Sequence, residues 1–69
     1  MLTLGKDSGV YFLRFDDGRM AEASDYPLIK TALVRYALAG VRISQSLPEH
    51  ERHDAAALCA RRAIMVRYA

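Results

Sequence analysis

The sequence predicts a single α+β domain, with a short antiparallel three-stranded β-meander over residues 1–23. An antiparallel αα-hairpin over residues 24–69 follows and is expected to dimerise through its helices. Apolar residues alternate with period two in the first third of the chain and recur at steps of three and four in the rest. A length of 69 residues leaves room for one domain, and a hydrophobic fraction of 52% favours an ordered fold.

The β-meander is predicted from alternation and from turn residues. Residues 1–4 form a short alternating run, and residues 5–9 form a loop in which two glycines enclose Lys, Asp and Ser. Residues 10–15 make the strongest strand, with apolar side chains on both faces. The Asp-Gly pair within residues 16–19 is typical of a type I′ hairpin turn, so residues 20–23 are expected to return as a third strand.

The first helix is predicted to begin near residue 24 and to end at residue 44 or 45. Ser24 and Asp25 are candidate N-caps, and Pro27 suits the first helical turn because no hydrogen bond needs its missing N–H there. Two apolar stripes follow at helical spacing. The main stripe consists of Ile29, Leu33, Tyr36, Gly40, Ile43 and Leu47, and the second consists of Val34, Ala37, Leu38 and Val41.

A helix with two apolar stripes needs cover on both sides, and a chain of 69 residues has little else to cover it with. Cys59 is the only cysteine, so no disulfide within the chain can stabilise so small a core. We therefore expect a homodimer built on the first helix, with the interior glycine allowing another backbone to approach. The predicted dimer interface consists of Val34, Leu38, Gly40 and Val41.

A second helix is predicted from the sequence Ser-Leu-Pro-Glu at residues 46–49, which has the form of a capping box with a proline in the first turn. Acidic residues near its start and arginines near its end agree with the helix dipole. Almost no loop remains between the two helices, so we expect a tight hairpin. The predicted core consists of Leu13, Phe15, Ile29, Leu33, Tyr36, Ile43, Leu58, Cys59 and Val66.

Two groups of residues on the second helix could carry chemistry, and each has a simpler interpretation. His50, His53 and Asp54 could place metal ligands on one helix face, but the first helix offers no further ligand along its body. Charged first turns are ordinary helix surface. Cys59 has alanines and a valine at helical spacing, which indicates a buried structural thiol rather than a nucleophile.

The paired carboxylates of Asp16 and Asp17 stand before a glycine in the predicted turn, where Asp is favoured by hydrogen bonds to its own backbone. We therefore expect a protein that is not an enzyme, with no catalytic residue, no metal and no cofactor. The sequence shows no secretory signal pattern and no apolar run of about 18 residues. Together with a single free thiol, this favours a cytoplasmic protein without membrane contact.

The arginines are the residues best suited to binding a partner. Arginine pairs with carboxylates or phosphates through two parallel hydrogen bonds, and tyrosine adds contact area at low entropy cost. The net charge of +2 permits an acidic partner without requiring nucleic acid. The predicted partner-binding residues are Arg35, Tyr36, Arg42, Arg62, Arg67, Tyr68 and, at the hairpin tip, Arg19. The strand face bearing Val10, Phe12 and Arg14 is the next candidate.

A strand followed by two helices is similar in topology to the ribbon-helix-helix DNA-binding proteins, which dimerise through such helices. In that family a short strand with alternating polar residues reads the major groove. The best strand here, within residues 11–15, is apolar on both faces, and residues 42–46 only approximate the family's turn between the helices. A small dimeric DNA-binding repressor is therefore the alternative function.

The chain as a whole resembles the small early proteins of temperate or transposable phages, which include anti-activators of quorum sensing and blockers of the type IV pilus motor. The resemblance rests on a short reading frame, on the lack of a catalytic pattern, and on a composition typical of GC-rich coding. That composition has eight Arg and two Lys beside eleven Ala. The resemblance implies an inhibitor that binds a host protein such as a transcriptional regulator in the host cytoplasm, and it assigns no role to individual residues.

Overall fold

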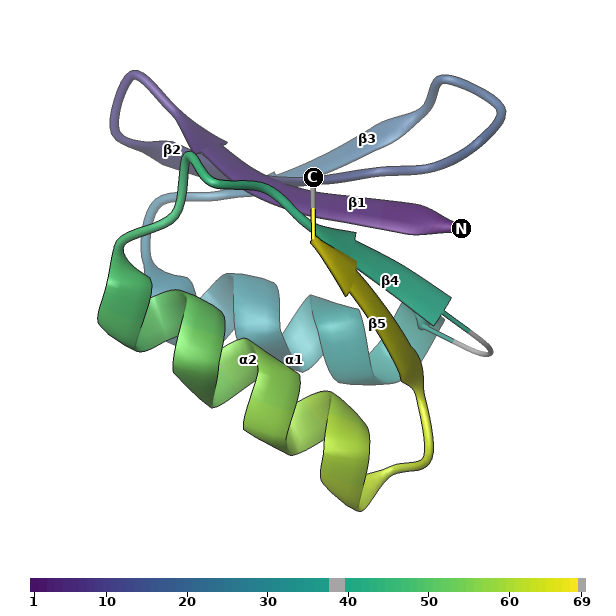
Figure 1. Cartoon of the computed structure of the whole chain (residues 1–69). Coiled ribbons are helices and arrows are strands. Elements are labelled where there is room, and N and C mark those ends of the chain that lie inside the picture. The colour runs from purple at the N-terminus through teal and green to yellow at the C-terminus, as the bar shows by residue number, and fades with distance from the viewer. Residues whose placement is uncertain (38–39, 69) are drawn as a thin grey trace.

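The computed structural model describes residues 1–37 and 40–68, which form a five-stranded mixed β-sheet with both helices on one face (Figure 1). Neither helix in these ranges is long and apolar enough to cross a membrane. The elements in chain order are β1 (Leu2–Asp7), β2 (Val10–Arg14), β3 (Met20–Ala23), α1 (Tyr26–Tyr36), β4 (Gly40–Ile43), α2 (Glu49–Arg61) and β5 (Met65–Tyr68). The strand order across the sheet is β3-β2-β1-β4-β5.

The predicted architecture, a three-stranded β-meander followed by an αα-hairpin, is wrong. β1, β2 and β3 do pair antiparallel within residues 1–23, but β4 adds to β1 in parallel and β5 adds to β4 in parallel. β4 also separates the two helices along the chain, so no αα-hairpin forms. The topological likeness to ribbon-helix-helix proteins depended on one strand followed by two helices, and it fails for the same reason.

The turn between β1 and β2 is the tight hairpin of the fold. Ser8 and Gly9 have φ angles of 51° and 80°, and they connect Asp7 to its cross-strand partner Val10. Two consecutive positive φ angles are the requirement of a type I′ turn. The sequence predicts that turn type at the Asp-Gly pair between β2 and β3 instead, and there only Gly18 has a positive φ.

Helix α1 begins where the capping residues predicted, but it ends much earlier. The Asp25 side chain accepts a hydrogen bond from the Leu28 backbone N–H at 3.0 Å, and Pro27 lies in the first turn. The helix ends at Tyr36, because Ala37 adopts extended backbone angles. Residues 40–43, which the prediction placed in the same helix, belong to the sheet.

Strand β4 explains why the predicted helix stops. Its Val41 and Ile43 are 0% exposed and pair with Leu2 and Leu4 of the central strand β1. The sequence Val-Arg-Ile alternates with period two, but the same residues also fit helical spacing when read with their neighbours. Burial of two β-branched side chains in the middle of the sheet decides in favour of the strand.

Helix α2 is also shorter than predicted, because the last residues form β5. Pro48 precedes the helix without a side-chain cap, so the predicted capping box does not form. At the other end, Ala63 has a φ of 57°, which turns the chain back towards the sheet. Met65–Tyr68 then pairs in parallel with β4, so the predicted helical end of the chain is wrong.

The core lies between the helices and one face of the sheet. Phe15, Leu58 and Val66 of the predicted core are only partly buried, and Tyr36 is 45% exposed. The buried hydrophobic residues are Leu2, Leu4, Tyr11, Leu13, Ile29, Leu33, Ala37, Val41, Ile43, Leu47, Ala55, Cys59 and Ile64.

Candidate binding surface on the open face of the sheet

The face of the sheet opposite the helices carries a line of side chains that are long and exposed except at its centre, where Thr3 is 8% exposed. In the strand register, Met20 lies opposite Arg14, Arg14 opposite Thr3, Thr3 opposite Arg42, and Arg42 opposite Arg67. Directly opposite residues project from the same face. These five positions therefore cross all five strands in one line on the open face. We call Arg14, Arg42 and Arg67 the arginine row.

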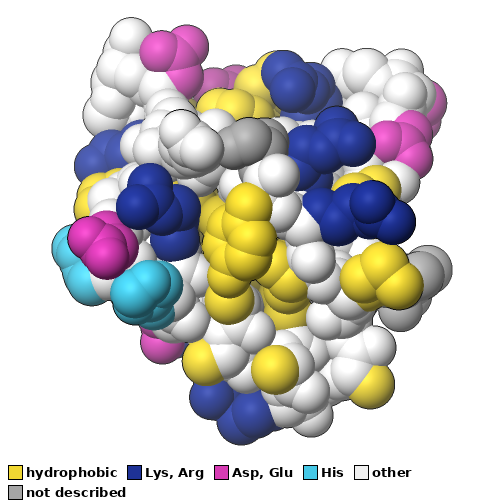
Figure 2. Space-filling model, in the orientation of Figure 1, with side chains coloured by type: hydrophobic (Ala, Val, Ile, Leu, Met, Phe, Trp, Pro, Cys, Tyr) yellow, Lys and Arg dark blue, Asp and Glu magenta, His cyan; other side chains and the backbone are white. Residues whose placement is uncertain are grey.

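The arginine row concentrates positive charge that no ion pair among the described residues neutralises. Neighbouring strands lie about 4.8 Å apart, so the Cα atoms of Arg42 and Arg67 are about 5 Å apart, and Arg14 lies about 10 Å from Arg42. Within residues 1–37 and 40–68, none of the three forms an ion pair, whereas Arg19 pairs with Asp17 at 2.7 Å. Figure 2 shows Lys and Arg side chains gathered over the sheet, towards the upper right.

An aromatic ring adjoins the arginine row on β2. The Phe12 ring lies over Gly5, where a Cβ atom would come within 2.5 Å of Phe12 Cζ, so the ring fits only above a glycine. The guanidinium carbon of Arg14 lies 5.8 Å from the ring centroid. A shallow hollow of about 470 Å³ adjoins the ring and is lined by Asp7, Ser8, Val10, Phe12, Arg14, Met20 and Glu22.

The structure divides the seven predicted partner-binding residues among different parts of the surface. Arg42 and Arg67 are neighbours in the arginine row. Arg62 is exposed directly after α2, and Arg35 is exposed in the last turn of α1. Tyr68 is 63% exposed, but it lies at the end of β5 on the side of the helices. These five residues therefore do not form one contact surface.

The other two predicted residues, Arg19 and Tyr36, meet at the β3 edge of the sheet. The Tyr36 ring packs edge-to-face on Phe15 with centroids 5.5 Å apart, and the Arg19 guanidinium carbon lies 5.4 Å from the Phe15 centroid. Together with Met20 and Ala21, they line a hollow of about 280 Å³. This cluster is separate from the arginine row.

The predicted dimer interface does not form a helical stripe. Val34 is half-buried in α1, but Gly40 and Val41 belong to β4, and the Val41 side chain is fully buried within its own chain. Leu38 lies outside the described residues. A homodimer stays a prediction, and its interface requires residues other than Val41.

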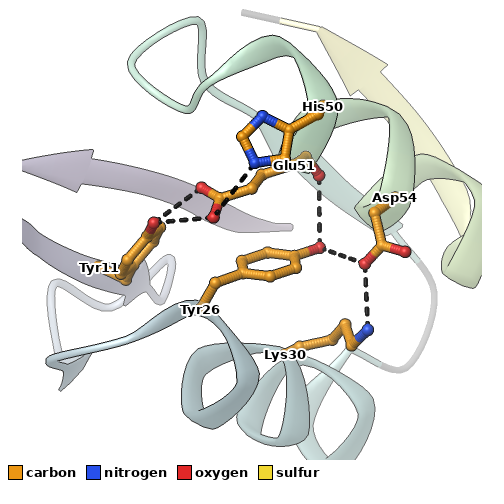
Figure 3. Close-up of polar contacts among 6 residues, drawn as sticks. All are labelled: Tyr11, Tyr26, Lys30, His50, Glu51 and Asp54. Carbon is orange, nitrogen blue, oxygen red and sulfur yellow. Dashed lines mark hydrogen bonds and ion pairs between the residues drawn. The ribbon is translucent and has the colours of Figure 1, made fainter.

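A polar network on the helix side joins β2, α1 and α2 (Figure 3). The Tyr11 hydroxyl donates to Glu51 Oε1 at 2.8 Å. The Tyr26 hydroxyl donates to Asp54 Oδ2 at 2.8 Å, and Lys30 Nζ donates to the same oxygen at 3.1 Å. Both carboxylates thus receive donors from other elements.

The pKa shifts in this network suit a structural role rather than proton transfer. Burial, and then the hydrogen bond to Asp54, raise the pKa of Tyr26, while the hydrogen bonds from Tyr26 and Lys30 lower the pKa of Asp54. The phenol therefore keeps its proton and the carboxylate its charge at neutral pH. The network holds α2 against α1 and the sheet.

The remaining candidate residues occupy ordinary environments. His50 and His53 are about three-quarters exposed or more, and they lie 4.0 Å and 3.9 Å from the carboxylates of Glu51 and Glu49. Cys59 is 0% exposed, and burial raises the pKa of its thiol, which suits the predicted structural role. In the turn between β2 and β3, the backbone N–H of Arg19 donates a hydrogen bond to the Asp17 carboxylate, which lowers the pKa of that carboxyl.

From the sequence, Phe12 and Arg14 belong only to the second candidate surface, and nothing in the chain's local pattern connects them with Arg42 and Arg67. Alternation along residues 10–15 correctly grouped Val10, Phe12 and Arg14 on one strand face. The missing signal was the period-two pattern of Val41, Arg42 and Ile43. The row itself depends on the register of strands that lie far apart in the sequence.

Comparisons with known protein families, curated proteins and solved structures found no match to this chain. Its function is therefore inferred from its own residues.

Proposed function

We propose that this chain is a non-enzymatic binding protein that docks the open face of its sheet on an acidic surface of another protein. The observation that carries this proposal is the arginine row, three arginines in register with no ion-pair partner among the described residues. Two like charges directly opposite each other destabilise a sheet. A partner that supplies carboxylates would relieve this repulsion between Arg42 and Arg67.

The residues around the row favour a protein partner over nucleic acid. Arginine, methionine and aromatic side chains are enriched in protein interfaces, and the row is flanked by Phe12, by Met20 at 50% exposure and by Met65 at 58% exposure. A surface that binds single-stranded nucleic acid usually offers several aromatic rings for stacking. The open face carries one ring, Phe12, in its described residues.

The finer part of the proposal concerns the partner's identity. We propose a phage or mobile-element inhibitor that binds and inactivates a regulatory protein in the host cytoplasm. The Arg-rich, Lys-poor and Ala-rich composition supports a GC-rich bacterium as the source of the chain and of its partner.

Two charge-matched variants test the proposal. The row variant replaces Arg14, Arg42 and Arg67 with Gln, and the control replaces three exposed arginines elsewhere. The control positions are Arg35, Arg61 and Arg62. Both variants lose three positive charges, so only the location of the charge differs, and thermal unfolding verifies that both fold.

Each protein is used to capture partners from a nuclease-treated lysate of a GC-rich bacterium. We expect the wild type and the control to retain one defined protein that the row variant loses, with each arginine contributing about 2 kcal/mol. Capture that the control variant loses equally would contradict the open-face surface. Recovery of DNA alone without nuclease, weakening steeply with salt, would support the DNA-binding alternative.

A further inference from the structure

The β3 edge of the molecule carries an apolar surface that no described residue covers. β3 pairs only with β2 within the described residues, so the main-chain groups on its outer side have no strand partner there. Beside it, α1 presents Leu28, Ala32 and Tyr36 at steps of four, which places them on one stripe. Leu28 is 56% exposed, Tyr36 is 45% exposed, and Met20 on β3 is 50% exposed.

The stripe and the strand form one surface. Tyr36, at the end of the stripe, lines the 280 Å³ hollow together with Met20 and Ala21 of β3. Ala32, in the middle of the stripe, is partly buried and packs against the core. An apolar helix stripe beside an open strand edge can receive another strand and its helix together.

Charge distinguishes this edge from the opposite edge at β5. The β5 end is basic, since Arg42 lies opposite Arg67 and two more exposed arginines, Arg61 and Arg62, lie at the end of α2, shortly before the strand. Two β5 edges brought together would add these charges to one another. By contrast, β3 carries one acidic side chain, Glu22, and no basic one. The first 27 residues of the chain, which include β3, contain five acidic and three basic residues.

We propose that a second copy of this chain docks at the β3 edge, so that the two β3 strands pair antiparallel about a two-fold axis. Opposite residues must share a face, so the axis passes through a residue position. Two registers pair three residues of each four-residue strand. One is centred on Ala21 and the other on Glu22. Centring on Glu22 would oppose two carboxylates, whereas centring on Ala21 sets Met20 opposite Glu22 of the partner subunit, so the Ala21 register is favoured.

The position of α1 fits this arrangement. α1 contacts both β2 and β3, so its axis lies beneath the space between them. A two-fold axis half a strand spacing beyond β3 would place α1 about 5 Å from the axis, and hence about 10 Å from its copy. Packed helices lie 8–10 Å apart, so the stripes with Leu28 and Ala32 would meet across the axis.

A dimer of this kind would also compensate for the small core, because the interface buries further apolar surface. An interface of standard size covers about 800 Å² of each partner, which is under a fifth of the 4323 Å² accessible surface of one chain. The open face remains free in such a dimer, and the two sheets join into one with an arginine row on each half. This inference does not depend on the proposed function.

Sedimentation equilibrium of the whole chain at micromolar concentrations tests the dimer with matched variants. Met20→Glu and Met65→Glu change the first residue of the two edge strands, at exposures of 50% and 58%. In the Ala21 register, Met20→Glu would set a carboxylate opposite Glu22 of the partner subunit. Leu28→Glu changes the exposed helix stripe. We expect Leu28→Glu and Met20→Glu each to raise the dimer dissociation constant about 30-fold or more, and Met65→Glu to change it by less than about 3-fold.

Cysteine cross-linking tests the register. Ala21→Cys would face its own copy at the axis, within the Cα separation that a disulfide allows, so oxidation should give covalent dimers. Ala23→Cys serves as the control, since it would lie opposite Arg19 of the partner subunit. A wild-type monomer across the concentration range, or a dimer weakened equally by Met65→Glu, overturns the proposal. Cross-linking through Ala23→Cys alone overturns the register.

Discussion

The two faces of the sheet are made by the same strands and differ in nearly everything else. On the helix side, Leu4, Leu13, Val41 and Ile43 are all 0% exposed. On the open side, alternate residues of the same strands include the three arginines of the row. The comparison shows that a strand such as β4 serves two purposes at once, because each successive side chain points to the opposite face.

The two faces also contribute to different properties, the helix side to the stability of the fold and the open face to the proposed partner binding. Residues towards the helices lose surface to water when the chain folds, so the free energy of folding depends mainly on them. The long side chains on the open face stay in solvent and can change without loss of the fold. The strongest tests of this separation compare neighbouring residues of one strand.

The largest expected effect comes from Leu13 and its neighbour Arg14. Leu13→Ala removes a fully buried side chain and should lower the free energy of unfolding by about 3 kcal/mol. Arg14→Ala, one residue further along β2, should change it by about 0.5 kcal/mol or less. Urea unfolding measures both values. Similar losses for the two variants would contradict the assignment of the faces.

A smaller effect is expected where the open face does depend on close packing. Gly5→Ala would place a Cβ atom 2.5 Å from the Phe12 ring and 3.1 Å from Ser46 Oγ, so the ring must move away. We expect a loss of about 1–2 kcal/mol in the wild type. The same substitution should cost markedly less in a Phe12→Ala background, because the clashing ring is gone.

A double-mutant cycle by urea unfolding checks this coupling. Full additivity of the two substitutions would show that the Phe12 ring does not lie over Gly5. It would also remove Phe12 from the description of the open face.

The smallest effect concerns the polar network on the helix side of the sheet, where Tyr26 and Lys30 bind Asp54. The folded state lowers the pKa of Asp54 below its ordinary value of 3.8, chiefly through the hydrogen bond from Tyr26 and then that from Lys30. The ionised carboxylate therefore stabilises the fold above about pH 4, and this contribution is lost as the pH falls through the folded-state pKa. Asp54 is partly exposed, so solvent screening keeps the effect to a few tenths of a kcal/mol.

Unfolding of Asp54→Asn across the acidic range measures this contribution. The stability difference from wild type should be present at pH 7 and should shrink below pH 4. Asp7→Asn, which removes an exposed carboxylate at the end of β1 and outside the network, serves as the control. A difference that stays constant with pH would mean that ionised Asp54 contributes nothing to the fold.

The sequence by itself determined the local features of this protein. The alternation of residues 10–15 predicted β2, and Asp25 with Pro27 predicted the start of α1. These features depend on neighbouring residues: side-chain period, capping and the fixed φ of proline. For the same reason the burial of Leu13 and Cys59 could be predicted from apolar spacing.

Only the tertiary structure decided that residues 40–43 and 65–68 form strands rather than helix. Both segments fit a helical pattern and a strand pattern, and the choice depended on β1 offering an unpaired edge to β4, and β4 then to β5. Parallel pairing is a long-range contact that no local spacing encodes. The arginine row follows from the same register, because Arg14, Arg42 and Arg67 become neighbours only when these strands pair.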